Sequence, residues 1–232
     1  MILLTGFEPF GTYKDNPSAE GAGALHGRTV DGVAVRGAIL PVHHASAAAL
    51  VAQLVQDVAP SAIVHLGLAG GRARLALERV AVNVMDFELA DNAGYRATGE
   101  PCVADGPAAY FSTLPLQAML EALSAEGVPA YLSSSAGTYL CNQTFYTTRH
   151  LLESQERDIP AGFIHLPLSP SMVVAAGLDQ PSMDVPLMIR AIEIALRVPS
   201  MPMSFSACGM PISFRKPSTH LRNPSNPPLM PR

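Results

Sequence analysis

Residues 130–152 read AYLSSSAGTYLCNQTFYTTRHLL, and this segment indicates the fold class. Residues 130–134 predict a short strand, Gly137 breaks the chain, and residues 140–152 predict a helix. A strand that leads through a glycine turn into a helix is the building unit of an α/β protein.

The rest of the chain repeats this alternation. Further strands are expected at 2–7, 33–40, 62–66, 75–84 and 163–166, and further helices at 19–26, 45–58, 116–126 and 185–198. Asn16 followed by Pro17 is typical of a helix start. Residues 86–106 are polar and rich in turn residues, which favours a long functional loop. We therefore predict one domain over 1–199, a three-layer α/β/α sandwich with a mostly parallel mixed sheet.

The composition limits the class of protein. Hydrophobic residues make up 48% of the 232 residues, which suffices for a large core. Charged residues make up only 15%, which suggests that other subunits cover part of the surface. The net charge of −4 gives no general support to a nucleic-acid partner. We see neither a cleavable signal nor an apolar run of about 18 residues, so we expect a cytoplasmic protein without a membrane span.

The composition changes at the C-terminal end. Residues 200–232 hold seven prolines and four basic residues but no Asp or Glu. A proline-dense segment without periodicity does not readily form secondary structure. We expect a basic tail that is disordered or loosely docked.

Cys141 is the cysteine best placed for chemistry. The chain has three cysteines, Cys102, Cys141 and Cys208, without disulfide-framework or zinc-ligand spacing, so we expect free thiols in a reducing compartment and no metal. Cys141 begins a predicted helix, where unpaired N–H groups favour a thiolate and an oxyanion. The alternative is a buried structural cysteine.

A cysteine nucleophile requires an imidazole and, behind it, a carboxylate. His165 follows Cys141 by 24 residues and ends a predicted strand, so both should reach the same edge of a parallel sheet. It could instead be a hydrogen-bonded core histidine. Glu78 is the one acidic residue in an apolar predicted strand, where a charge needs a partner. An ion pair with Arg72, Arg74 or Arg79, or exposure on an edge strand, would explain it equally well.

Two glycine-rich turns do not predict nucleotide binding. Residues 5–11 lack the G-x-G-x-x-G pattern, and residues 67–71 lack the Lys-Ser/Thr of a phosphate-binding loop.

Five ordered segments together resemble the pyroglutamyl peptidase I family. They are LLTGFEPFG at 3–11 with NPS at 16–18, AGGR at 69–72 with ERVAVN at 78–83, DGPAAYF at 105–111, SAGTYLCN at 135–142 and FIHLP at 163–167. The resemblance covers about residues 1–198. It selects the same Cys141, His165 and Glu78 that the chemistry proposed.

The resemblance implies a cysteine exopeptidase that hydrolyses the bond after an N-terminal pyroglutamyl residue. Its catalytic triad would be Glu78, His165 and Cys141, on an α/β/α sandwich that forms homotetramers or dimers and needs no cofactor. Its substrates would be peptides with N-terminal pyroglutamate. It further implies a lactam pocket in which aromatic rings flank the substrate ring, formed by Phe7, Phe10, Leu68, Tyr139 and Leu140.

Two residues depart from the family pattern. Many bacterial members have glutamine in place of Leu68 and arginine in place of Glu88. These departures motivate an alternative, namely a weakened or inactive relative that binds small peptides or acts as a scaffold. A cysteine amidohydrolase with a different lactam or acyl substrate is a second alternative.

Overall fold

The computed structural model describes residues 1–200, with side chains described as far as Val198. The predicted proline-rich tail, 200–232, lies outside the described residues apart from Ser200, which ends a helix. Cys208 also lies outside them.

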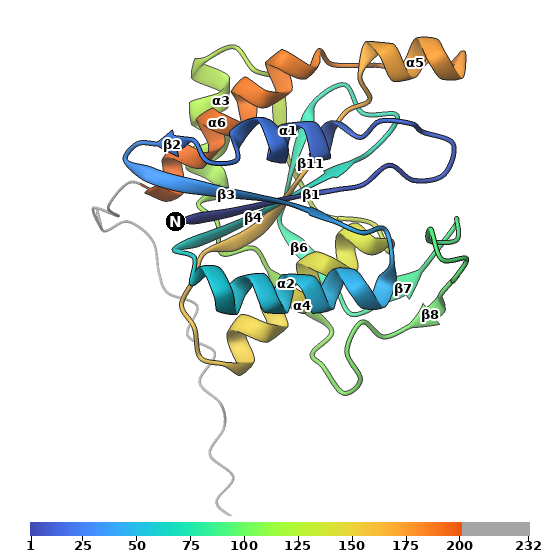
Figure 1. Cartoon of the computed structure of the whole chain (residues 1–232), viewed down its shortest axis with the longest axis vertical. Coiled ribbons are helices and arrows are strands. Elements are labelled where there is room, and N and C mark those ends of the chain that lie inside the picture. Colours follow the sequence, from blue (N-terminus) through green and yellow to red (C-terminus); the bar gives the residue numbers. More distant parts are fainter. Residues whose placement is uncertain (201–232) are drawn as a thin grey trace, which may run out of the picture. The chain divides into compact units, whose positions relative to one another are not determined.

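A seven-stranded sheet forms the centre of the described residues (Figure 1). Its strands are β1 (Ile2–Phe7), β2 (Thr29–Val30), β3 (Val33–Leu40), β4 (Ala62–Leu68), β5 (Leu75–Glu78), β10 (Ala130–Ser133) and β11 (Ala161–Leu166). They lie in the order β10-β5-β11-β4-β1-β3-β2. Strands β11, β4, β1 and β3 run parallel, whereas β5 is antiparallel to β11 and β2 is antiparallel to β3. The prediction of a mostly parallel mixed sheet is confirmed.

Helices cover both faces of this sheet, as Figure 1 shows. The helices are α1 (Pro17–Leu25), α2 (His44–Val58), α3 (Leu116–Ala125), α4 (Leu140–Ser154), α5 (Pro170–Ala176) and α6 (Val185–Ser200). Alternate residues of a strand point to opposite faces. Ile2 and Leu4 accordingly pack in one core with α1, α3 and α6, while Leu3 packs in a second core with α2 and α4. The three-layer arrangement is therefore confirmed.

The start of α1 packs directly on β1. Asn16 caps the helix by accepting a hydrogen bond from the Ser18 backbone N–H, and Pro17 occupies its first turn. A Cβ atom at Gly6 would lie 2.1 Å from the Ser18 carbonyl oxygen, so only glycine permits this approach. The contact fixes the end of β1, which carries Phe7, and the segment that follows it, which carries Phe10.

The prediction of one strand over 75–84 is wrong. The chain leaves the main sheet after Glu78, and β6 (Val80–Val82) pairs instead with β9 (Ala109–Phe111). Similarly, the predicted loop at 86–106 contributes to a small hairpin of β7 (Met85–Asp86) and β8 (Thr98–Glu100). Both pairings join segments distant in sequence, so hydrophobic periodicity within one segment could not indicate them.

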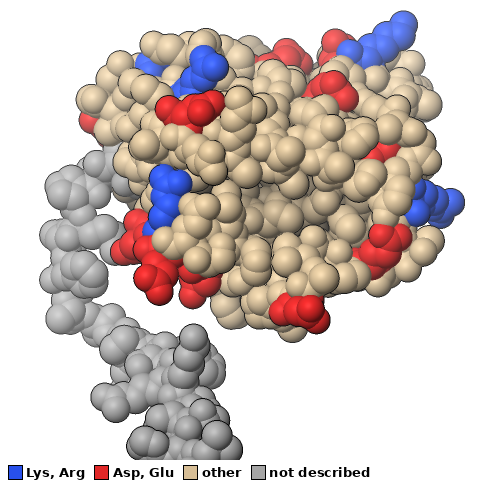
Figure 2. All heavy atoms as spheres, turned by 60° about the horizontal axis from the view of Figure 1, so that its bottom comes forward, with Lys and Arg blue, Asp and Glu red and all other residues tan. Residues whose placement is uncertain are grey.

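The described surface carries few charges on the face shown in Figure 2. Uncharged side chains cover most of this face, and its Lys and Arg side chains do not gather into one patch. Within residues 1–200, no helix has both the length and the apolar character needed to cross a membrane.

Candidate active site

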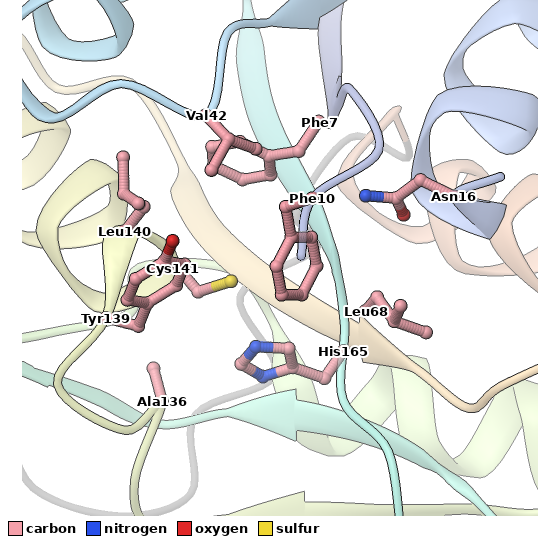
Figure 3. A pocket seen from close by; sticks show the side chains of 10 residues that line it. All are labelled: Phe7, Phe10, Asn16, Val42, Leu68, Ala136, Tyr139, Leu140, Cys141 and His165. Carbon is pink, nitrogen blue, oxygen red and sulfur yellow. The ribbon is translucent and has the colours of Figure 1, made fainter. Parts of the chain in front are cut away.

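Cys141 lies in the first turn of α4, after the turn that the sequence predicted. The chain leaves β10, turns at Gly137 with a φ of +76°, and enters α4 at Leu140. N–H groups in a first helical turn have no partner within the helix. In Figure 3 the Cys141 sulfur points into a cavity. The thiol therefore faces this cavity from the start of a helix.

Asn142 fastens this turn to the neighbouring chain. Its side-chain oxygen accepts from the Val82 N–H at 2.9 Å, and its Nδ2 donates to the Val82 and Val84 carbonyls, both at 2.9 Å. The side chain is fully buried. These three hydrogen bonds fix the position from which Cys141 projects.

Glu78 and His165 lie on neighbouring antiparallel strands. Glu78 is directly opposite Phe163, so His165, two residues further along β11, projects from the same face. The His165 Nδ1 lies 2.8 Å from Glu78 Oε1, and the protonated ring nitrogen donates to the carboxylate. This hydrogen bond selects the tautomer in which Nε2 can accept a proton.

Gly67 provides the space between the thiol and the imidazole. It is directly opposite His165 in the β4–β11 pairing. A Cβ atom at Gly67 would lie 2.8 Å from Cys141 Sγ and 2.7 Å from the Phe163 ring. The sulfur therefore occupies the place beside His165 that a side chain at position 67 would fill. The three residues selected from the sequence are thus brought together.

Burial governs the protonation of the reacting groups. Desolvation, with the Glu78 charge, raises the pKa of Cys141 to about 12, and the Arg72 charge opposes this only in part. Burial also lowers the pKa of His165, although the hydrogen-bonded Glu78 carboxylate acts in the other direction. Desolvation therefore opposes the thiolate that the helix start favours, and it favours the neutral form of the imidazole as well.

The Glu78 carboxylate accepts hydrogen bonds from two side chains. Besides His165, the Arg72 Nη1 lies 2.9 Å from the same Oε1. The Glu78 side chain is fully buried. Burial by itself would raise the pKa of Glu78, but the bonds from His165 and Arg72 hold it below its ordinary value. The ion pair with Arg72, which the sequence left as an alternative, coexists with the bond to His165.

The cavity in front of Cys141 is small and largely apolar (Figure 3). Its volume is about 120 Å³, well below the roughly 300–1,000 Å³ of pockets for drug-sized ligands. The five residues that the family resemblance implied all line it, and so do Cys141 and His165. Sequence reasoning did not assign Asn16, Val42 and Ala136 to it, although Asn16 was identified as a helix cap. The full lining comprises Phe7, Phe10, Asn16, Val42, Leu68, Ala136, Tyr139, Leu140, Cys141 and His165.

A second cavity adjoins the first. Phe10 and Tyr139, whose ring centroids are 6.0 Å apart, line both. The second cavity has a volume of about 300 Å³, and its lining includes Asp86, Glu88 and the exposed Leu89. Glu88 therefore faces the space next to the small cavity and not its interior.

Glu8 braces the wall of the small cavity. Its Oε1 accepts from the Val42 N–H at 2.9 Å and from Asn92 Nδ2 at 3.0 Å. Asn92 Nδ2 also donates to the Pro9 carbonyl. The bonds join the segment after β1, which carries Phe10, to the loop after β7.

One group among the described residues has the residue types of a metal site. Ligating atoms of His43, His44 and Asp91 lie within 4.8 Å of one another. His43 Nδ1 accepts from the Ser46 N–H, while Asp91 accepts from His44 and from the backbone of Tyr95. These hydrogen bonds explain why the three side chains lie together at the start of α2.

Comparison with known proteins gives a consistent result. The family model described as pyroglutamyl peptidase matches residues 1–201. A pyrrolidone-carboxylate peptidase of Bacillus cereus is 39% identical over 197 residues, which are 85% of this chain and 91% of the relative. A protein of the same name from Deinococcus radiodurans is 44% identical over 182 residues, 78% of this chain and 84% of the relative.

Solved structures agree with the sequence relatives. The pyrrolidone carboxyl peptidase of Thermococcus litoralis superposes with a TM-score of 0.83 at 37% identity, over 86% of this chain and 92% of that one. The enzyme of Pyrococcus furiosus gives the same TM-score and identity, over 86% and 97%.

Proposed function

The chain belongs to the pyroglutamyl peptidase family, and on this premise we propose that it removes N-terminal pyroglutamate from peptides through a thioester on Cys141. The observation that carries the proposal is the constellation at the small cavity. Cys141 and His165 line it together, and Glu78 is hydrogen-bonded to the far side of the imidazole.

In the first half of the reaction the thiol attacks the pyroglutamyl carbonyl carbon. The Cys141 proton passes to His165 Nε2 as the carbon–sulfur bond forms, because burial raises the pKa of the thiol to about 12. Backbone N–H groups at the start of α4 stabilise the oxyanion. Glu78 stabilises the imidazolium that results. His165 then protonates the leaving peptide nitrogen, the carbon–nitrogen bond breaks, and a thioester remains.

In the second half, water releases the acyl group. His165 takes a proton from the water, whose oxygen attacks the thioester carbon. The sulfur leaves, recovers its proton, and free pyroglutamate departs. The reaction exchanges one amide bond for a thioester and then an acid, so its balance requires only water.

The lining of the cavity supports a compact, uncharged end group. Phe7, Phe10 and Leu68 present apolar surfaces to a cavity of about 120 Å³, which suits a small ring. Val42, Tyr139 and Leu140 close the remaining sides. We infer that aromatic rings flank the lactam while backbone and side-chain polar groups bind its amide.

Chromogenic amides test this function. The protein should release the chromophore from a pyroglutamyl amide but not from prolyl or alanyl amides. Release from several of them would favour the broader amidohydrolase, and no release by folded protein would favour the inactive scaffold. Cys141→Ala should abolish turnover, whereas Cys102→Ala should be nearly silent, since the Cys102 sulfur makes only weak hydrogen bonds, to the Val82 and Val84 carbonyls and from Asn142 Nδ2. Equal loss in both variants would refute the assignment of Cys141.

We also propose that the enzyme forms a homodimer or homotetramer in the cytoplasm. Val174 and Phe111 are large apolar side chains with exposed fractions of 81% and 73%, which a subunit interface would cover. Cys141 must stay a free thiol, which a reducing compartment favours. Light scattering at several protein concentrations tests the subunit count, and a monomer at all of them contradicts it. Localising a tagged chain in cell fractions tests the compartment.

A further inference from the structure

Arg72 lies in the loop between β4 and β5 and contacts the same carboxylate oxygen of Glu78 as the imidazole does. Its Nη1 is 2.9 Å from Glu78 Oε1, and His165 Nδ1 is 2.8 Å from the same oxygen. Two donors thus share one acceptor oxygen. Moving or removing one donor therefore changes the position of this oxygen and the electrostatic field at the other donor.

Burial makes this sharing consequential. The Glu78 side chain has no exposed surface, while the Arg72 side chain is 27% exposed. A buried carboxylate that bonded only a neutral imidazole would lack a compensating charge, which is costly. Arg72 supplies that charge while its side chain stays partly exposed to solvent.

Building on the proposed triad, we propose that Arg72 is a positioning residue that keeps Glu78 ionised and opposes protonation of His165. Arg72 itself lines neither cavity and does not touch the substrate space. Its effect passes through Glu78 and through its charge at the imidazole.

The charged and titratable groups around His165 define the expected sign. Glu78 on β5 favours the imidazolium, whereas Arg72 on the preceding loop disfavours it. On α4, burial raises the pKa of the Cys141 thiol to about 12. On β4, His65 is paired with Phe163, and burial keeps it neutral by lowering its pKa to about 3. Without Arg72, the Glu78 charge therefore acts unopposed, and His165 takes up a proton more readily.

The neighbouring arginine offers a matched control. Arg74 belongs to the same loop, but its guanidinium carbon lies 4.7 Å from the centre of the Tyr131 ring. Replacing it removes the same type of charge from the same segment without removing a donor to Glu78.

The first measurement is the pH profile of kcat/KM on a pyroglutamyl amide for Arg72→Gln, Arg72→Lys and Arg74→Gln. In Arg72→Gln the acidic limb should move to higher pH by about 0.5–1 unit, from Coulomb's law at these distances with partial screening. In Arg72→Lys and Arg74→Gln the acidic limb should lie at the same pH as in the wild-type enzyme. A fall in kcat/KM without movement of the limb, or movement to lower pH, would overturn the proposal.

The second measurement does not depend on turnover, so it separates this proposal from the assignment of the nucleophile. In a Cys141→Ala background, NMR titration of His165 should give a higher imidazole pKa with Arg72→Gln than with Arg72 present. An unchanged or lower value would refute the role of Arg72 even if Cys141 is the nucleophile. If Arg72→Gln does not fold, the pKa of His165 is measured in Arg72→Lys instead. Because lysine keeps the positive charge, a rise of this pKa by about half a unit or more would show that the charge at position 72 is not the cause.

Discussion

Gly67→Ala would place one methyl group in the space that the catalytic sulfur occupies. The added Cβ would lie 2.8 Å from Cys141 Sγ and 2.7 Å from the Phe163 ring. Both distances are shorter than van der Waals contact allows, so a neighbour must move. The Phe163 ring is fully buried, and its centroid lies 4.7 Å from that of the His165 ring. Whichever neighbour moves, the separation of thiol and imidazole changes.

The magnitudes follow from packing and from the geometry of the reaction. Overpacking a filled core by a methyl group costs about 1–3 kcal/mol, and each kcal/mol lowers the Tm of a domain of this size by about 2–4 °C. A displacement of about 1 Å between reacting groups costs on the order of 100-fold in rate. We therefore expect kcat/KM to fall on the order of 100-fold while Tm falls by about 2–12 °C.

The assay compares hydrolysis of a pyroglutamyl amide with thermal unfolding in two variants. Gly23→Ala is the control, because a Cβ there meets nothing within 4 Å and Gly23 is in helix α1. That change should stabilise the protein by about 0.5–1 kcal/mol and leave kcat/KM unchanged. If Gly67→Ala retained activity within twofold of the wild-type enzyme, the sulfur would not lie over Gly67 beside His165, and the reasoning would be refuted.

Three further outcomes are expected. His65 is buried between Thr5 and Thr148, and burial lowers its pKa to about 3. Between pH 6.5 and 3, His65 therefore takes up a proton only in the unfolded chain. The free energy of unfolding should fall across that range as the pH falls. Urea unfolding should show a loss of roughly 3 kcal/mol by pH 4 that His65→Gln lacks; equal losses in both proteins would contradict this. Because the pKa of Cys141 is raised to about 12, its alkylation by iodoacetamide should keep accelerating above pH 9, and a plateau near neutral pH would indicate a thiolate instead. Glu88→Arg should lower the preference for a basic residue after pyroglutamate, measured as a ratio of kcat/KM values for two peptides, and an unchanged ratio would exclude Glu88 from specificity.

The fold class could be predicted because its causes are local. Apolar runs, glycine turns and a helix cap at Asn16 follow from residues close in sequence. The predicted central strands and long helices occur in the structure with ends shifted by a few residues. The break after Glu78 was missed because β6 depends on a distant partner: Val80 pairs with Phe111, 31 residues further along the chain.

The site shows the same division between local and distant causes. The position of Cys141 at a helix start was visible in the sequence, because a glycine turn before an apolar-periodic segment defines it. The choice among the possible partners of Glu78 was not visible, because it depends on β5 running antiparallel to β11, so that Glu78 lies opposite Phe163. That register gives the carboxylate two partners, His165 and Arg72, where sequence reasoning weighed them as alternatives.

The sequence by itself determined which residue types were available and which local turn would present the thiol. Only the tertiary structure decided how strongly that thiol is desolvated. A helix N-terminus favours a thiolate, but desolvation and the Glu78 charge raise the pKa of Cys141, and desolvation depends on every element packed around the sulfur. The same holds for Gly67, whose missing side chain matters only because β4, β11 and α4 meet there.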